Sequence, residues 1–154
     1  MSNLPQENQN QSSSEKSFAD VFADERIEWM EKLKDTSARF RKIEDMAEVQ
    51  VILYSDRQIA LEYMFKLMSI HTKLKKVMLE AWKKAYDNLE NADIRYNDKE
   101  RMKMADNAIS AVKYKTDTVS NHIEYFRETI KTIDNMIFGV KHRIDIENYK
   151  AGLK

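Results

Sequence analysis

The sequence predicts an all-α protein: a long antiparallel helical hairpin with an N-terminal helical arm and a coiled-coil-like C-terminal helix, assembled as a homo-oligomer. From Met102 to Ile144, one apolar position recurs in alternating steps of three and four residues, which is the repeat of a helix packed along another long helix. The 154 residues include only two glycines and one proline, so turns are scarce and sheet hairpins are not expected. Both observations favour a few long helices.

The first third of the chain divides into a tail and an arm. Residues 1–17 consist largely of Asn, Gln and Ser, a composition that buries too little apolar surface to offset the entropy of ordering, and we expect a disordered polar tail. Residues 18–54 form the expected N-terminal helical arm. Its apolar spacing predicts a first helix over about 18–34 and a second over about 38–54, separated by an Asp-Thr-Ser cluster that can end one helix and cap the next.

Residues 55–152 form the expected helical hairpin. Ser55 and Gln58 have the spacing of a capping box, which either marks a helix start or lies within a helix that runs through it. An apolar stripe continues over about 59–92, lapses in a short polar segment, and resumes after Asn97, whose spacing to Glu100 again fits a capping box. Two long helices joined by a short turn are expected to pack antiparallel.

The last helix carries the apolar ladder, which only Thr116 interrupts with a hydroxyl. Over about six heptads, the ladder gives a seam of about 60 Å that requires a partner helix in the same chain or in a second copy. Gly139 lies within the ladder, where it permits a close helix approach or a bend, or is a tolerated weak spot. Gly152 follows the last turn, where a left-handed C-cap favours glycine.

Several functional classes lack their signatures. The chain has no cysteine, and none of His71, His122 and His142 has a glutamate three positions before it, as a di-iron carboxylate bundle requires. Gly-rich phosphate loops, nucleophile elbows and HExxH motifs are also missing, so we expect no enzyme, no cofactor and no metal. Neither a secretion signal nor an apolar run of about 18 residues is present, and we expect a cytoplasmic protein without a membrane span.

The net charge of zero conceals an uneven distribution. Residues 1–62 carry a net charge of −5, residues 66–86 carry +5, and the remainder is balanced. On a helical wheel, five lysines of the basic segment share one sector beside the apolar stripe: Lys66, Lys73, Lys76, Lys83 and Lys84. This lysine stripe is either an ordinary solvated face or a contact for a polyanion such as single-stranded nucleic acid. Trp82 and Tyr86 are candidates for base stacking, although the wheel places them on the opposite flank.

The C-terminal segment is similar to a known family. The run from Val140 to Gly152, which reads VKHRIDIENYKAG, resembles the closing motif of the UvsY family of phage recombination mediators. Upstream, Tyr125 and Phe126 followed by the Ile-Lys-Thr-Ile stretch over 130–133 resemble the aromatic pair and the Ile-Lys-Thr-Ile element of that family. The similarity extends over about 53–152.

This resemblance implies a recombination mediator, which is a non-enzymatic factor that binds single-stranded DNA. Members of the family form rings of six or seven subunits and help a RecA-like recombinase to replace the single-strand DNA-binding protein. The resemblance makes the lysine stripe the candidate DNA contact and part of the ladder the candidate oligomerisation surface. The assembly residues are Ile123, Phe126, Ile130, Ile133, Ile137, Val140 and Ile144.

Two other functions are compatible with the sequence. A coiled-coil structural or scaffolding protein of a phage would need the long helices but not the positive charge. A basic amphipathic helix that lies on a membrane surface would need both the helix and the positive charge. Binding to anionic vesicles would reveal this function.

Overall fold

A computed structural model describes residues 16–152 of the chain, all helical apart from short connections. Four α-helices follow one another: α1 (Phe18–Ala38), α2 (Met46–Glu90), α3 (Asp98–Ala108) and α4 (Ser110–Lys150). Two single-turn 3₁₀ helices, η1 (Arg39–Arg41) and η2 (Ile43–Asp45), connect α1 to α2. The described part of the chain contains no strand, and the predicted all-α class is confirmed.

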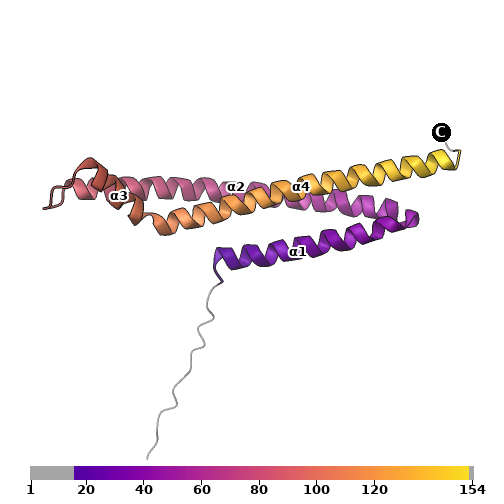
Figure 1. The fold of residues 1–154 in the computed structure, drawn as a ribbon, viewed down its shortest axis with the longest axis horizontal. Coiled ribbons are helices and arrows are strands. Elements are labelled where there is room, and N and C mark those ends of the chain that lie inside the picture. The colour runs from indigo at the N-terminus through magenta and orange to yellow at the C-terminus, as the bar shows by residue number, and fades with distance from the viewer. Residues whose placement is uncertain (1–15, 153–154) are drawn as a thin grey trace, which may run out of the picture.

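Helices α2 and α4 form the predicted antiparallel pair (Figure 1). The ladder of α4 supplies one side of their interface, and Val49, Leu53, Ala60 and Leu67 of α2 supply the other. Each large apolar side chain buried there contributes about 1.5–3 kcal/mol relative to exposure. The hydroxyl of Thr116 donates a hydrogen bond of 2.8 Å to the carbonyl oxygen of Val112, so the one polar position of the ladder is satisfied within its own helix.

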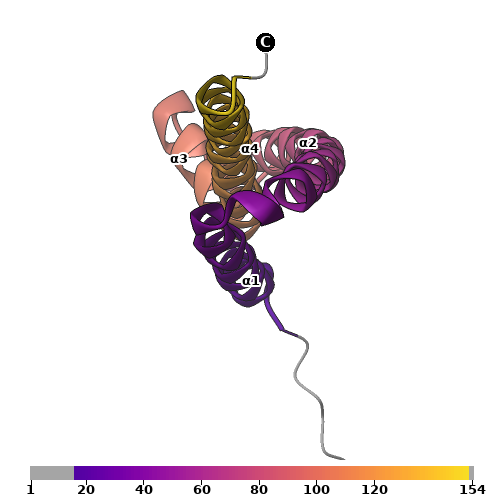
Figure 2. The same ribbon diagram turned by 90° about the vertical axis from the view of Figure 1, so that its right-hand side faces the viewer.

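Helix α1 lies along only one half of the hairpin, the half that includes the C-terminal end of α4 (Figures 1 and 2). It starts beside Thr118, and η1, which follows it, lies beside Arg143, whose guanidinium donates to the carbonyl oxygens of Phe40 and Arg41. In this half, α1, α2 and α4 surround a common core. In the other half, α2 packs on α4 and α3 alone.

The expected tail and arm require two corrections. Residues 1–15 lie outside the described part of the chain, whereas Ser17, within the expected tail, caps α1: its side chain accepts a hydrogen bond from the amide of Asp20. No helix end occurs at the expected arm boundary between residues 54 and 55. Helix α2 runs through it, and Gln58 bonds Glu62 at 2.7 Å rather than capping a helix start. The change of helix occurs earlier, at η1 and η2.

The turn after α2 confirms one prediction and modifies another. Asn97 and Glu100 form the predicted capping box at the start of α3, with hydrogen bonds of 2.9 and 3.0 Å. The expected single long helix is divided at Ile109, whose backbone departs from helical geometry. This break turns α3 against the end of α2 (Figure 1).

The two glycines have different roles. Gly152 adopts a φ of +72° just after α4, which confirms the predicted left-handed cap. A Cβ built on Gly139 would meet no atom within 4 Å, so no close helix approach requires glycine at this position.

Candidate nucleic-acid interface

Helix α2 carries the whole lysine stripe. All five lysines are exposed. They extend over about 27 Å along the axis at 1.5 Å per residue. Because α2 is continuous through this region, helix geometry alone fixes the spacing of the positive charges.

Four of the five lysines lie beyond the N-terminal end of α1. Phe18, the first residue of α1, lies beside Thr118 of α4, and His71 of α2 lies beside Ser120. The lysines after His71 therefore belong to the half of the hairpin that α1 leaves open (Figure 1).

Lys66 differs from the other four in its surroundings. It shares a groove between α1 and α2 with Glu25, Glu28 and Glu62. These carboxylates offset its charge and repel a phosphate. Lys66 is therefore the weakest candidate contact of the stripe.

One carboxylate also lies within the open part of the stripe. The ammonium of Lys76 is 3.9 Å from an oxygen of Glu80, and both side chains are largely exposed. A pair of this kind stabilises a helix by less than about 1 kcal/mol, so a phosphate can replace the carboxylate at little cost.

Trp82 and Tyr86 attach α3 to α2 and are only partly exposed, so they are poorly placed for base stacking. The indole N–H of Trp82 donates to Asp106 at 2.8 Å, and the two rings stack on each other at 5.2 Å. The guanidinium of Arg101 lies 4.1 Å from the centre of the Tyr86 ring, a cation–π contact. This cluster explains why α3 folds against the end of α2.

Phe65 is an aromatic side chain of this surface that the sequence analysis did not single out. It is 56% exposed, and it lines a shallow depression with Met68, Ser69, Thr72 and Lys73. On a helical wheel, Phe65 lies almost half a turn away from the apolar stripe, and this position could have indicated an exposed ring.

The predicted oligomerisation residues lie in the core of the single chain. Ile123, Phe126, Ile130, Ile133, Ile137 and Val140 are at most 9% exposed, and Ile144 is half-buried against the same core. The ladder finds its partner helix in α2 and, over the covered half, in α1. In the folded single chain these side chains therefore have no free face for a second copy, and assembly through the ladder stays a prediction.

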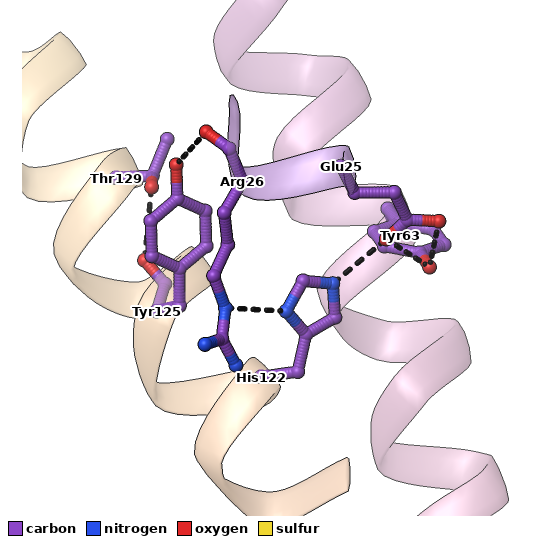
Figure 3. Close-up of polar contacts among 6 residues, drawn as sticks. All are labelled: Glu25, Arg26, Tyr63, His122, Tyr125 and Thr129. Atoms are coloured by element: carbon purple, nitrogen blue, oxygen red, sulfur yellow. Dashed lines mark hydrogen bonds and ion pairs between the residues drawn. The ribbon is translucent and has the colours of Figure 1, made fainter. Parts of the chain in front are cut away.

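A buried polar cluster joins α1 to the hairpin, and His122 is at its centre (Figure 3). The side chain of His122 is fully buried. Its Nε2 lies 2.7 Å from a carboxylate oxygen of Glu25, and its Nδ1 accepts a hydrogen bond of 3.4 Å from Nε of Arg26. The hydroxyl of Tyr63 donates to the same carboxylate at 2.7 and 2.8 Å.

The electrostatics of this cluster favour a neutral imidazole. Burial lowers the pKa of His122, and the neighbouring Glu25 opposes this shift only in part. Burial also raises the pKa of Tyr63, and its hydrogen bond to Glu25 acts in the same direction. Because His122 has no exposed surface, it cannot contact a substrate, and the cluster holds α1 in place.

A second polar contact of α1 is an ion pair between Lys32 and Asp56. The ammonium of Lys32 is 2.7 Å from one oxygen of Asp56, whose side chain is almost fully buried, and the other oxygen has no hydrogen-bond partner among residues 16–152. In the same part of the chain, no group of three or more His, Asp or Glu side chains is arranged to bind a metal.

Comparison with known protein families, with curated proteins and with solved structures finds no match to this chain. Over the described residues, none of the helices combines the length and the apolarity that crossing a bilayer requires. The geometry of the basic surface is therefore the main basis for a functional proposal.

Proposed function

We propose that this protein binds single-stranded DNA without catalysing a reaction, and that it acts as a recombination mediator. The observation that carries the proposal is the open half of α2, where Lys73, Lys76, Lys83 and Lys84 are exposed on one continuous helix. A single strand can follow such a row of charges because its backbone is flexible and its phosphates are regularly spaced.

The role in recombination is supported by the resemblance of the C-terminal segment to the UvsY family. This resemblance implies two partners: a RecA-like recombinase and the single-strand DNA-binding protein that the recombinase replaces. The lysine stripe would then hold the strand during the exchange.

Self-association is part of the proposal, because one chain offers few phosphate contacts. Five contacts predict a slope of about −3.5 in a plot of log affinity against log salt concentration, at about −0.7 per contact. An oligomer would multiply these contacts and gain avidity.

The proposed contact between copies is a groove on the outer side of α1 and α4, because the ladder is buried. Ile27, Met30 and Leu33 of α1 line this groove together with Tyr125 and Thr132 of α4. Met30 is 62% exposed there, so a second copy would bury apolar surface that the single chain leaves in water.

A fluorescence anisotropy titration of labelled oligo-dT tests the DNA proposal. Replacing Lys73, Lys76, Lys83 and Lys84 by alanine should weaken binding and reduce the slope from about −3.5 to about −0.7. The matched control replaces Lys34, Lys42, Lys99 and Lys113, which are equally exposed on other elements, and so removes the same charge.

The control variant should retain most of the affinity. Equal losses in the two variants would show that net charge, rather than the lysine stripe, determines binding. Failure of the unaltered protein to bind at low salt would contradict the proposal and favour the structural or scaffolding alternative.

A further inference from the structure

Phe65 is exposed in a region where the fold gives it no packing role. Phe22 and Phe126 are buried in the core, whereas Phe65 points away from α4 and has 56% of its surface in water. Burial of a phenyl ring is favourable, so an exposed one beside Lys73, where the open part of the lysine stripe begins, suggests contact with a ligand.

The surroundings of Phe65 combine an apolar surface with positive charge. Phe65 and Met68 provide the apolar part of the depression, Ser69 and Thr72 provide hydroxyl groups, and Lys73 lies at its edge. The hydroxyl of Thr72 donates to the carbonyl oxygen of Met68 at 3.0 Å, so its proton is already used within α2 and only its oxygen can still accept.

The depression is continuous with the lysine stripe. Phe65, Ser69, Thr72, Lys76 and Lys83 succeed one another in steps of three, four or seven residues, which places them along one line of the outer face of α2. A strand that follows Lys83 and Lys76 along this line therefore reaches the Phe65 ring.

We propose that Phe65, supported by Met68, is a stacking platform for one unpaired base of single-stranded DNA, and that Lys73 and Lys76 hold the adjoining phosphates. Every base has a π face, so an aromatic platform binds without regard to sequence, and its energy adds to that of the phosphate contacts. This inference rests on the proposed function, since the platform needs a bound strand.

The test compares two ligands with the same number of phosphates, a labelled oligo-dT and an oligomer of equal length made only of abasic sites. Phe65→Ala should weaken binding of oligo-dT by about 5- to 150-fold, the range for the loss of one stacked base. It should leave the affinity for the abasic oligomer unchanged, and the salt slope with both ligands unchanged, because no charge is removed.

Two further variants give the inference its controls. Phe65→Trp keeps an aromatic face and should retain the affinity for oligo-dT. Phe138→Ala removes another exposed phenylalanine, 72% exposed on α4, and should affect neither ligand. Unchanged circular dichroism melting of each variant establishes that the helices are intact.

Each contrary outcome has a distinct meaning. If Phe65→Ala binds oligo-dT as tightly as the unaltered protein, or loses affinity equally for both ligands, the stacking platform is refuted while DNA binding by the lysines stands. If the unaltered protein binds neither ligand, the proposed function fails and the platform fails with it.

Discussion

At the scale of single residues, His122 determines how α1 attaches to the hairpin. Its ring lies between a carboxylate and a guanidinium, and Phe22 stacks on it with the ring centres 4.0 Å apart. The hydrogen bonds assign the proton of the neutral ring to Nε2, which donates to Glu25, and leave Nδ1 to accept from Arg26. A second proton would place an N–H opposite the N–H of Arg26, so protonation opposes docking of α1.

The stability of the protein should therefore fall in mild acid. Burial holds the pKa of His122 below its ordinary value of 6.5, so between these two pKa values the unfolded chain binds a proton that the folded chain does not. The free energy of unfolding is consequently highest above pH 6.5 and decreases as the pH falls towards the folded pKa. Urea denaturation at intervals from pH 5 to pH 8 measures this slope.

Two histidine variants identify the source of the slope. His122→Gln should be less stable at pH 8 and lose the His122 part of the pH dependence. His142→Gln, at an exposed position, should keep both the stability and the slope of the unaltered protein. A slope that persists in His122→Gln would assign it to other groups.

The ion pair of Lys32 and Asp56 gives a second prediction at this scale. Lys32→Met leaves the buried carboxylate of Asp56 without a cation, and we expect a loss of about 1–3 kcal/mol, below the value for a fully buried pair because Lys32 is 44% exposed. Adding Asp56→Leu should recover part of this loss, since the uncompensated charge is then gone. A double-mutant cycle from urea denaturation measures the coupling, and purely additive losses would contradict it.

At the scale of elements, periodicity predicts more than local capping signals do. The ladder identifies the seam of α4, and the capping box at Asn97 identifies the start of α3, because both depend on residues close in sequence. The same box spacing at Ser55 is uninformative, since α2 already satisfies the backbone amides there.

Features that depend on long-range contacts could not be predicted from the sequence. The ladder indicates that α4 needs a partner but not that α2 and α1 of the same chain supply it. The burial of His122 depends on Glu25, which lies 97 residues away. A helical wheel of α2 alone predicts the exposed lysines. The contact of Trp82 with Asp106 depends instead on α3, which packs on α2 because the helix breaks at Ile109 between α3 and α4.

Gly139 provides a prediction at the scale of one helix. It lies inside α4 with an exposed, unobstructed position for a Cβ, so Gly139→Ala should raise the free energy of unfolding by about 1 kcal/mol through the higher helix propensity of alanine. Gly152→Ala is the matched contrast and should not stabilise the protein, because Gly152 has a positive φ. Thermal unfolding followed by circular dichroism distinguishes the two, and destabilisation by Gly139→Ala would indicate that glycine is needed within α4.

At the scale of the whole molecule, the two halves of the hairpin have different surfaces. Helix α1 adds six carboxylates and three cationic side chains to the half of the hairpin that it covers. The other half, which carries the four lysines beyond the N-terminal end of α1, is basic. This separation directs a polyanion to the open half, although the formal net charge of the protein is zero.

The same division predicts how mutations in the two apolar surfaces will differ. Ile130→Asp places a charge in the buried core and should destabilise the chain by more than about 3 kcal/mol, so that its melting temperature falls. Met30→Asp alters the exposed groove between α1 and α4, and should leave the melting temperature nearly unchanged while lowering the mass measured by light scattering. Met104→Asp, at an exposed position on α3, is the control and should change neither quantity. If Met30→Asp has the same mass as the unaltered protein, copies do not meet at this groove, and the proposed contact between them is refuted.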